Sequence, residues 1–452
     1  MVAGGLRRRL QARAQAGRSL RIGVIGAGKF ATMFLSQALR LPGLHVLGVA
    51  DLSLERAREA LRLAGWPRER TAAGGFAEAL EWGSTCLTES GEELIAAEGL
   101  ELVIEATGVP AAGIRHALMA FDRGLHVVMV NVEADALAGP LLAERAAAAG
   151  VVYSLAYGDQ PALICELVDW ARACGFDPVS AGKGSKYLPE YHRSTPETVW
   201  DYYGFSQETV ARGDFNPRMF NSFLDGTKSA IEMAAVANAT GLTPQPDGLR
   251  FPPAGADKLA RVCRPEAEGG RLAHKGTVEV VSSLERDGRV VANDLRWGVF
   301  VTFEAASDYV ARCFAEYGLV TDETGRYTAM YRPYHLIGLE LAVSVLRAGL
   351  LGEATGSPTA FRGDVVATAK RDLRVGETLD GEGGYCVYGR LLPAAASLRA
   401  GALPIGLAHG IELTQDVKAG ETLRWSDVAL GLDDPTVRFR KEMEARFARF
   451  KV

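Results

Sequence analysis

A glycine-rich turn near the start of the chain has the residue types and spacing of a dinucleotide site. In GVIGAGKFA, an apolar run leads into Gly26, Gly28 and Ala31, and an amphipathic segment follows. Gly26 would allow a tight turn from strand to helix, Gly28 would let the backbone approach a pyrophosphate, and Ala31 would let the helix pack on the strand. The pyrophosphate would lie at the helix N-terminus, where free N–H groups favour anions. Two further candidate contacts lie within the turn, Lys29 and Phe30.

A second apolar run, LHVLGVAD, ends in an acidic residue at the distance expected for such a site. Asp51 lies 23 residues after Gly28, about where a carboxylate binds the ribose hydroxyls of NAD. A glycine turn alone is also typical of ordinary packing, but the carboxylate makes a nicotinamide dinucleotide the stronger interpretation. The choice between NAD and NADP stays open, because Ser53 and Arg56 could accommodate a 2′-phosphate if Asp51 turned away.

Cationic side chains in GKGSK could bind an anionic substrate. Lys183 has a glycine on each side, which predicts open surroundings, and a strand end would direct it into a cleft between domains. Lys186, His192 and Arg193 follow closely. A solvated surface is the alternative for each. We expect Lys183 to be catalytic, and Lys186 and Arg193 to bind substrate.

The segment FLDGTKSAIEMAAVAN carries charges on an otherwise apolar helix. Residues three and four apart share a helical face, so one helix here would align Asp225, Lys228 and Glu232. A surface stripe of ion pairs is one interpretation. The interpretation we favour is a desolvated Lys228 that exchanges a proton with a substrate oxygen during hydride transfer, with Asp225 orienting it.

The segment MYRPYHLIGLE places an arginine and a histidine at the predicted start of a helix. Pro333 suits a first helical turn, and the guanidinium fork of Arg332 suits a phosphate or carboxylate. Arg332 and His335 therefore join the expected substrate-binding residues. An arginine in water and a structural histidine are the alternative.

Alternating strands and helices should position the glycine turn in a parallel, doubly wound sheet. After Asp51 come a helix at 54–65, a strand at 100–108, a helix at 114–124, a strand at 126–133, a helix at 136–150 and a strand at 151–158. Ligands of open sheets bind outside the carboxyl ends of strands. This makes four residues candidate cofactor contacts: Thr107, Gly108, Asn131 and Glu133.

The pattern changes after Pro161. The expected elements are a strand at 179–188, a helix at 223–241, strands at 275–284 and 297–305, and a helix at 334–350 that packs back on the first domain. They predict an α+β domain with a mixed sheet. We place the Rossmann domain at 1–158, the α+β domain at 159–355 and a β domain at 356–452.

The β domain contains a weak internal repeat. KRDLRVGETLDGEGGY, which begins at Lys370, and TQDVKAGETLRWSDV, which begins at Thr414, share D-[LV]-[KR]-x-G-E-T-L at a spacing of 44. Two related β units are implied, in a small pseudo-symmetric domain. A charged helix should follow from Pro435.

Composition excludes several classes of protein. The 452 residues carry a net charge of −5, which gives no field for nucleic acid or an anionic membrane, so a small-molecule substrate is expected. Six cysteines without paired spacing indicate neither disulfides nor zinc, and they favour a cytoplasmic location. Acidic side chains could hold a divalent ion, but no spacing demands one. The first twenty residues, rich in arginine, are expected to form a short helix, and a transit peptide is the alternative.

Several segments of the chain resemble those of a known family. GVIGAGKFATMFLSQAL, EATGVPAAGIRHALMAFDRGLHVVMVNVEADAL, NSFLDGTKSAIEMAAVANATGL, YRPYHLIGLELAVSV and the two GETL segments resemble homoserine-dehydrogenase-like oxidoreductases that end in a SAF domain. Among them the chain is similar to the DXR-like (DRL) group. These enzymes convert 1-deoxyxylulose 5-phosphate to methylerythritol 4-phosphate, an isoprenoid precursor, with NADPH.

The resemblance implies a Rossmann domain, an α+β catalytic and dimerisation domain, and a C-terminal β-clip SAF domain, in a homodimer. Homoserine dehydrogenase is similar more loosely, since its helical Asp and Lys are four apart and those here are three apart. Its lysine after a strand-end Asn is also replaced, by Val132 and Glu133 after Asn131.

Three functions follow as hypotheses. The first is an NAD(P)H-dependent oxidoreductase acting on a CH–OH group of a small phosphorylated hydroxy-ketone or sugar phosphate. The second is homoserine dehydrogenase. The third is a regulator that binds the dinucleotide without transferring hydride.

Overall fold

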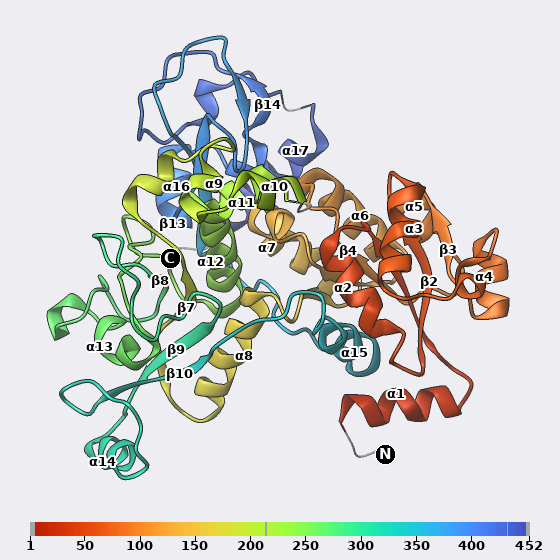
Figure 1. Ribbon diagram of the computed structural model, residues 1–452, viewed down its shortest axis with the longest axis horizontal. Coiled ribbons are helices and arrows are strands. Elements are labelled where there is room, and N and C mark those ends of the chain that lie inside the picture. The colour runs from red at the N-terminus through yellow and green to blue at the C-terminus, as the bar shows by residue number, and fades with distance from the viewer. Residues whose placement is uncertain (1–4, 213–214, 432, 449–452) are drawn as a thin grey trace. The chain divides into compact units, whose positions relative to one another are not determined.

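The computed structural model describes residues 5–212, 215–431 and 433–448, which divide into two compact units (Figure 1). The first unit combines the chain up to Leu163 with His335–Thr359. The second combines Ile164–Tyr334 with the chain from Ala360 onward. We describe each unit by itself, and the three-domain division at 158 and 355 stays a prediction.

The first unit is built on a six-stranded parallel sheet. Its strands are β1(Leu20–Ile25), β2(Leu44–Ala50), β3(Cys86–Thr88), β4(Leu102–Glu105), β5(His126–Met129) and β6(Tyr153–Leu155). The order is β3-β2-β1-β4-β5-β6, and every neighbouring pair is parallel. The chain thus runs outward from β1 twice, which confirms the predicted doubly wound Rossmann-type sheet. The short edge strand β3 was not predicted from the sequence.

Helices cover this sheet and bury an apolar core against it. They are α1(Leu6–Gln15), α2(Lys29–Ala38), α3(Leu54–Leu63), α4(Phe76–Trp82), α5(Gly91–Ile95), α6(Pro110–Asp122), α7(Val132–Ala148) and α15(Ala342–Leu351). Helix α15 contacts α1, α2, β4, β5 and β6, so the predicted return of a late helix to the first domain is confirmed. The expected N-terminal helix is also present, with Leu10 buried in this core.

Several boundaries differ from the predictions in this unit, and two of the differences affect candidate site residues. The strand expected at 126–133 ends at Met129, because the Asn131 side chain accepts the Ala134 N–H at 3.1 Å and starts α7. The helix expected at 334–350 begins only at Ala342. Residues after Pro333 form turns instead, so Arg332 is not at a helix start.

The second unit contains a mixed four-stranded sheet, as predicted. The strands β7(Asp177–Ser185), β8(Thr277–Ser282), β9(Val299–Glu304) and β10(Tyr327–Arg332) lie in the order β10-β9-β7-β8. Only β7 and β8 run parallel. Five further helices belong to the body around this sheet: α8(Gln160–Ala173), α9(Val199–Tyr203), α10(Gln207–Arg212), α13(Leu259–Val262) and α14(Asp308–Glu316).

The helix predicted over 223–241 is two helices. α11(Pro217–Leu224) ends at Asp225, and α12(Thr227–Thr240) begins after Gly226. Gly226 has φ +89°, a left-handed conformation that suits glycine and breaks the helix. Asp225 therefore does not share a continuous helical face with Lys228, and that prediction was wrong.

The C-terminal part of the second unit forms two antiparallel pairs. β11(Gly363–Ala369) pairs with β13(Val387–Pro393), and β12(Thr378–Asp380) pairs with β14(His409–Glu412). α16(Ala394–Ala400) and the predicted charged helix α17(Pro435–Phe447) accompany them. α12 contacts β7 and β8 and also β11 and β13 (Figure 1).

The internal repeat is visible as a pseudo-twofold exchange of hydrogen bonds. Leu373 and Val417, 44 apart, donate to each other's carbonyl at 2.8 and 3.0 Å. Asp372 accepts the Ala419 N–H, and Asp416 accepts the Val375 N–H, both at 3.0 Å. Each contact is the other shifted by one repeat. The two GETL segments therefore form a pseudo-symmetric β unit, as expected.

Candidate active site

The glycine turn at the start of α2 has the backbone geometry its sequence requires. Gly26 has φ +96°, and a Cβ added to it would lie 2.5 Å from the carbonyl oxygen of Ala106. At Gly28, the N-cap of α2, an added Cβ would meet nothing within 4 Å. Ala31 is buried in the core. The turn is therefore closed toward the sheet and open in front of the helix.

The start of α2 fits the pyrophosphate of a dinucleotide. Its first intrahelical hydrogen bond runs from the Thr32 N–H to the Gly28 carbonyl at 3.0 Å, so the preceding N–H groups face beyond the helix end. The first turn contains Lys29, which is exposed, and no acidic residue; Phe30 is half-buried. Backbone donors, open space and positive charge coincide there.

Asp51 is held in a network of its own. Its carboxylate accepts the Ala27 N–H at 2.8 Å and the Ser53 N–H at 2.9 Å, and it forms an ion pair with Arg56. Burial works to raise the pKa of Asp51, but the Arg56 guanidinium and the two backbone donors outweigh it and lower the pKa. The carboxylate already has partners on both oxygens.

Arg56 borders a pocket that runs along α3. The pocket has a volume of about 500 Å³, and its lining consists of Ser53, Glu55, Arg56, Arg58, Glu59 and Arg62. The Arg56 side chain is 58% exposed. A guanidinium that neutralises Asp51 and faces this pocket is suited to a phosphate.

The candidate contacts after β4 and β5 lie at the carboxyl ends of these strands. The Thr107 hydroxyl donates to the buried Glu105 at 2.6 Å, and the Asn131 amide donates to the Val109 carbonyl at 2.9 Å. Gly108, between them, has φ +69°. Glu133 is half-buried in the first turn of α7. Since β4 and β5 are neighbours, the structure brings these loops together as expected.

In the second unit, strand register places two of the expected cations at one level of the mixed sheet. Lys183 on β7 is opposite Val299 on β9, and Val299 is opposite Arg332 on β10. Residues directly opposite each other on paired strands point to the same face. Lys183 and Arg332 therefore share a face of the sheet, two strands apart.

Lys183 is buried and paired with a carboxylate. Its ammonium donates to Glu232 on α12, and the two side chains are 7% and 4% exposed. Lys228, which is half-buried, lies one turn earlier on the same helix. Lys183 and Glu232 are thus in contact between β7 and α12, and Lys228 lies on the same face of α12 as Glu232.

The surroundings of Lys183 are crowded, so the expectation of open space was wrong. A Cβ on Gly182 would lie 1.7 Å from the Glu279 carbonyl oxygen, and one on Gly184 would lie 1.9 Å from that of Leu295. The glycines let neighbouring backbone press against β7. They fix the strand that carries Lys183.

Asp225 has a partner that the sequence analysis did not find. Its buried carboxylate lies 2.7 Å from the ammonium of Lys370, which is 2% exposed. Lys370 also donates to the carbonyls of Ser194 and Gly384, each at 2.8 Å. A lysine at the end of the buried strand β11 was the available signal, because a buried ammonium requires acceptors.

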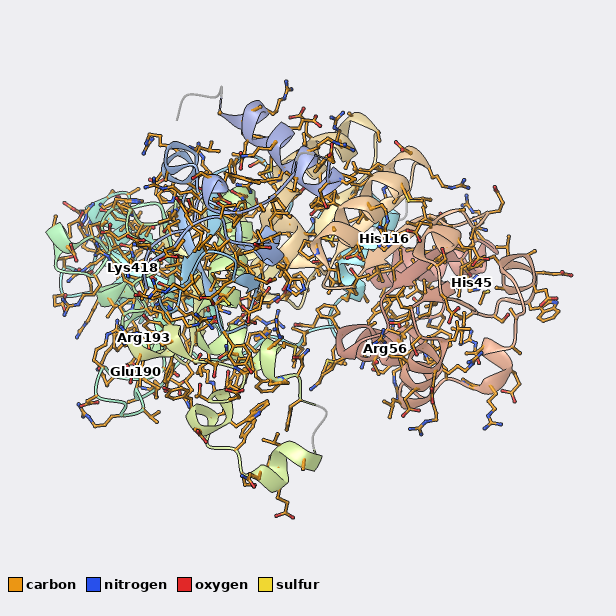
Figure 2. The ribbon with its side chains drawn as sticks, turned by 90° about the horizontal axis from the view of Figure 1, so that it is seen from above. His45, Arg56, His116, Glu190, Arg193 and Lys418 are labelled. Carbon is orange, nitrogen blue, oxygen red and sulfur yellow. The ribbon has the colours of Figure 1, made fainter. Side chains whose placement is uncertain are left out.

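Lys186, His192 and Arg193 differ in their environments. The Lys186 ammonium donates to the Tyr202 carbonyl, and burial and then the charge of Arg296 lower its pKa. His192 Nδ1 donates to the Asp225 carbonyl at 2.7 Å, and burial lowers its pKa. Arg193 is exposed (Figure 2).

The remaining expectations concern His335 and a metal. His335 is half-buried and belongs to the first unit, whereas Arg332 belongs to the second. Within the described ranges, no group of three or more His, Cys, Asp or Glu side chains is arranged to hold a metal ion. Among the described helices, none has the length and apolarity needed to cross a membrane.

Two family models match parts of the chain from residue 158 onward. Residues 158–341 match "Oxidoreductase DRL, catalytic domain", and residues 364–429 match the SAF domain. The expected SAF domain is thus confirmed, and so is the similarity to the DRL group in its catalytic domain. No curated protein matches the sequence.

Solved structures show weaker likenesses. Myo-inositol dehydrogenase from Lactobacillus casei is 13% identical, with a TM-score of 0.28 over 40% of this chain and 50% of that chain. Scyllo-inositol dehydrogenase from the same organism is 12% identical, with 0.35 over 74% and 88%. A probable dehydrogenase from Thermotoga maritima is 14% identical, with 0.35 over 74% and 90%. The chain thus spans half the length of the myo-inositol dehydrogenase from Lactobacillus casei.

Because these TM-scores lie below 0.5, they carry no argument about function. The catalytic-domain match shows that residues 158–341 are similar to an oxidoreductase catalytic domain, and the Rossmann-type sheet with its glycine turn has the geometry of a dinucleotide-binding fold.

Proposed function

We propose that this chain is an NAD(P)-dependent oxidoreductase acting on a CH–OH group, and that it reduces a small phosphorylated hydroxy-ketone or sugar phosphate. The observation that carries the proposal is the gathering of Lys183, Lys228 and Arg332 around one face of the mixed sheet. A carbonyl that accepts hydride develops negative charge on its oxygen, and lysine ammonium groups stabilise that charge and supply the proton. The guanidinium of Arg332 suits a phosphate.

The residues proposed to act on the substrate would have different roles. Lys228 gives a proton to the substrate oxygen, while Glu232 holds Lys183 in place. Asp225 acts on Lys228 through the start of α12, where its carboxylate accepts the Thr227 N–H at 2.9 Å. Lys186, Arg193, Arg332 and His335 are the proposed anion-binding residues. When bound, the dinucleotide supplies the hydride.

For the cofactor we propose NADP(H). Both Asp51 oxygens have donors, so this carboxylate is poorly disposed to bind a ribose diol. Arg56 offsets its negative charge and borders the pocket at α3. Gly26, Gly28, Lys29, Phe30 and Ala31 would hold the pyrophosphate, with Thr107, Gly108, Asn131 and Glu133 at the neighbouring loops.

The first test is a scan of nicotinamide absorbance with NADPH and NADH against two substrates. We expect oxidation of NADPH with 1-deoxyxylulose 5-phosphate, as the DRL resemblance implies, and none with aspartate semialdehyde. Oxidation with the semialdehyde alone would establish homoserine dehydrogenase instead. Tight dinucleotide binding with no turnover on a wider phosphosugar panel would favour a regulator.

The cofactor assignment has its own test. Arg56→Ala should raise the KM for NADPH by about 10-fold or more, since a charge-assisted contact is lost, and leave that for NADH nearly unchanged. Arg40→Ala, a change of another arginine of the first unit, is the matched control. An equal effect of Arg56→Ala on both cofactors would contradict the proposal. The expected homodimer can be tested by light scattering.

A further inference from the structure

The SAF part of the chain contacts the catalytic helix through two buried groups. Lys370 is the residue after β11, and its Nζ lies 2.7 Å from Oδ2 of Asp225. The Gly389 N–H on β13 donates to the Thr227 hydroxyl at 2.8 Å. Asp225 and Thr227 flank Gly226, and Lys228 follows directly. Both contacts therefore fix the first turn of α12.

Lys370 also joins segments that are far apart in sequence. Its other two acceptors are the carbonyl of Ser194, which directly follows the segment carrying His192 and Arg193, and the carbonyl of Gly384 in its own domain. Two N–H groups of the ammonium donate to these carbonyls, and the same ammonium forms the ion pair with Asp225. The side chain is 2% exposed and surrounded by these protein groups, so its place is structural with respect to the reacting atoms.

His192 contacts both the segment before α12 and a SAF strand. Its Nδ1 lies 2.7 Å from the Asp225 carbonyl, and its ring stacks on Tyr388 of β13 with centroids 4.4 Å apart. A carbonyl only accepts, so Nδ1 carries the proton, and Nε2 is left to accept from the Tyr187 hydroxyl at 3.0 Å. The SAF strands thus contact both the helix start and the loop beside it.

We infer that the SAF domain is part of the catalytic machinery, and that Lys370 is a positioning residue that holds the start of α12 and hence Lys228. This inference rests on the proposed function. A misplacement of about 1 Å at a reacting group can cost about 100-fold in rate. Loss of Lys370 leaves the buried Asp225 carboxylate without its counter-ion, and the carbonyls of Ser194 and Gly384 keep only the Asn221 amide as a donor, so the helix start should shift or fray.

The test measures turnover and backbone dynamics in the full-length chain. Lys370→Met should lower kcat for NADPH oxidation with 1-deoxyxylulose 5-phosphate by about 100-fold per folded molecule, with the KM for NADPH unchanged. Amide hydrogen exchange at the first turn of α12 should become faster. Lys418→Met, which removes an exposed lysine of the same domain paired with Asp372, is the matched control and should change neither.

A milder variant covers the case in which Lys370→Met does not fold. Thr227→Val removes only the acceptor of the Gly389 N–H, and it should lower kcat by about 5-fold and speed exchange at the same turn. Wild-type kcat and wild-type exchange in whichever of the two variants folds would overturn the inference. If Lys228→Met also keeps full turnover, the proposed function fails instead, and exchange at α12 then decides the inference alone.

Discussion

Two buried lysines contact carboxylates at α12, one from the mixed sheet and one from the SAF strands. Lys183 pairs with Glu232 in the middle of the helix, and Lys370 pairs with Asp225 just before its start. Both pairs are nearly inaccessible. Lys370 shares its remaining donors between two backbone carbonyls, whereas Lys183 shares a sheet face with Arg332.

Burial of a charged pair does not by itself define a catalytic group. The ammonium of Lys370 is surrounded by one carboxylate and two backbone carbonyls, which suits a fixed support. The environment of Lys183 places it beside other cations expected to meet substrate. The same kinds of substitution, made in both ion pairs, should therefore reveal the different roles of Lys183 and Lys370.

The largest effect is expected from removing one partner of either pair. Lys183→Met and Lys370→Met should each lower the free energy of unfolding by about 3–5 kcal/mol, because a buried carboxylate is left unpaired. Urea denaturation measures this loss. A loss below about 1 kcal/mol in either variant would mean that the carboxylate finds water or another donor.

Apolar replacement of whole pairs should distinguish them. Lys183→Met with Glu232→Leu should recover most of the lost stability, since buried ion pairs can often be replaced by apolar side chains. Lys370→Met with Asp225→Leu should recover less, because the carbonyls of Ser194 and Gly384 lose the ammonium and keep only the longer hydrogen bonds from the Asn221 amide, at 3.2 and 3.5 Å. Equal recovery of stability in the two double variants would show that the backbone contacts of Lys370 do not distinguish it from Lys183.

A third buried acid, whose hydrogen-bond partner is neutral, sharpens the comparison through pH. Asp135 accepts from the Tyr153 hydroxyl at 2.9 Å, and burial raises its pKa to about 7. Between its unfolded value, near 4, and pH 7 the folded state binds the extra proton, so stability falls as pH rises. The slope should approach about 1.4 kcal/mol per pH unit.

Asp135→Asn isolates this contribution from other groups, such as Glu279, whose pKa burial also raises to about 7. Thermal unfolding from pH 5 to pH 8 should show a smaller decline in Asp135→Asn than in the wild type. Parallel curves would show that Asp135 does not titrate in this range.

The smallest effects should come from exposed pairs in the SAF repeat. Asp372 and Asp416 make equivalent contacts, with Lys418 at 3.0 Å and Arg374 at 2.9 Å. Asp372→Ala and Asp416→Ala should lower the urea midpoint by equal amounts, well below the buried pairs, because solvent screens exposed charges. Unequal midpoints would show that the two structurally equivalent ion pairs contribute different amounts to the free energy of unfolding.

Local sequence patterns predicted much of this fold because they reflect local physics. The glycine turn, the alternation of strands and helices, and the doubled GETL segment each specify a unit whose neighbours in space are also near in sequence or repeat. They were sufficient for the parallel sheet and the β domain, and the residues of the dinucleotide turn lie as expected.

The errors concern positions that distant contacts decide. Gly226 breaks a helix that apolar periodicity would continue, since Asp225 accepts the Thr227 N–H and is itself held by Lys370, about 145 residues later. Arg332 ends an edge strand because β9 pairs with it, although Pro333 suggested a helix start. The packing around Gly182 likewise depends on the distant backbone of Glu279.

The most direct test of the central claim is the turnover of Lys228→Met at saturating NADPH and 1-deoxyxylulose 5-phosphate. Loss of a group that transfers a proton in the transition state typically costs 10²–10⁴-fold, so we expect kcat to fall by about that factor while NADPH still binds. A kcat within about twofold of the wild type would contradict the account, because Lys228 would then carry no proton.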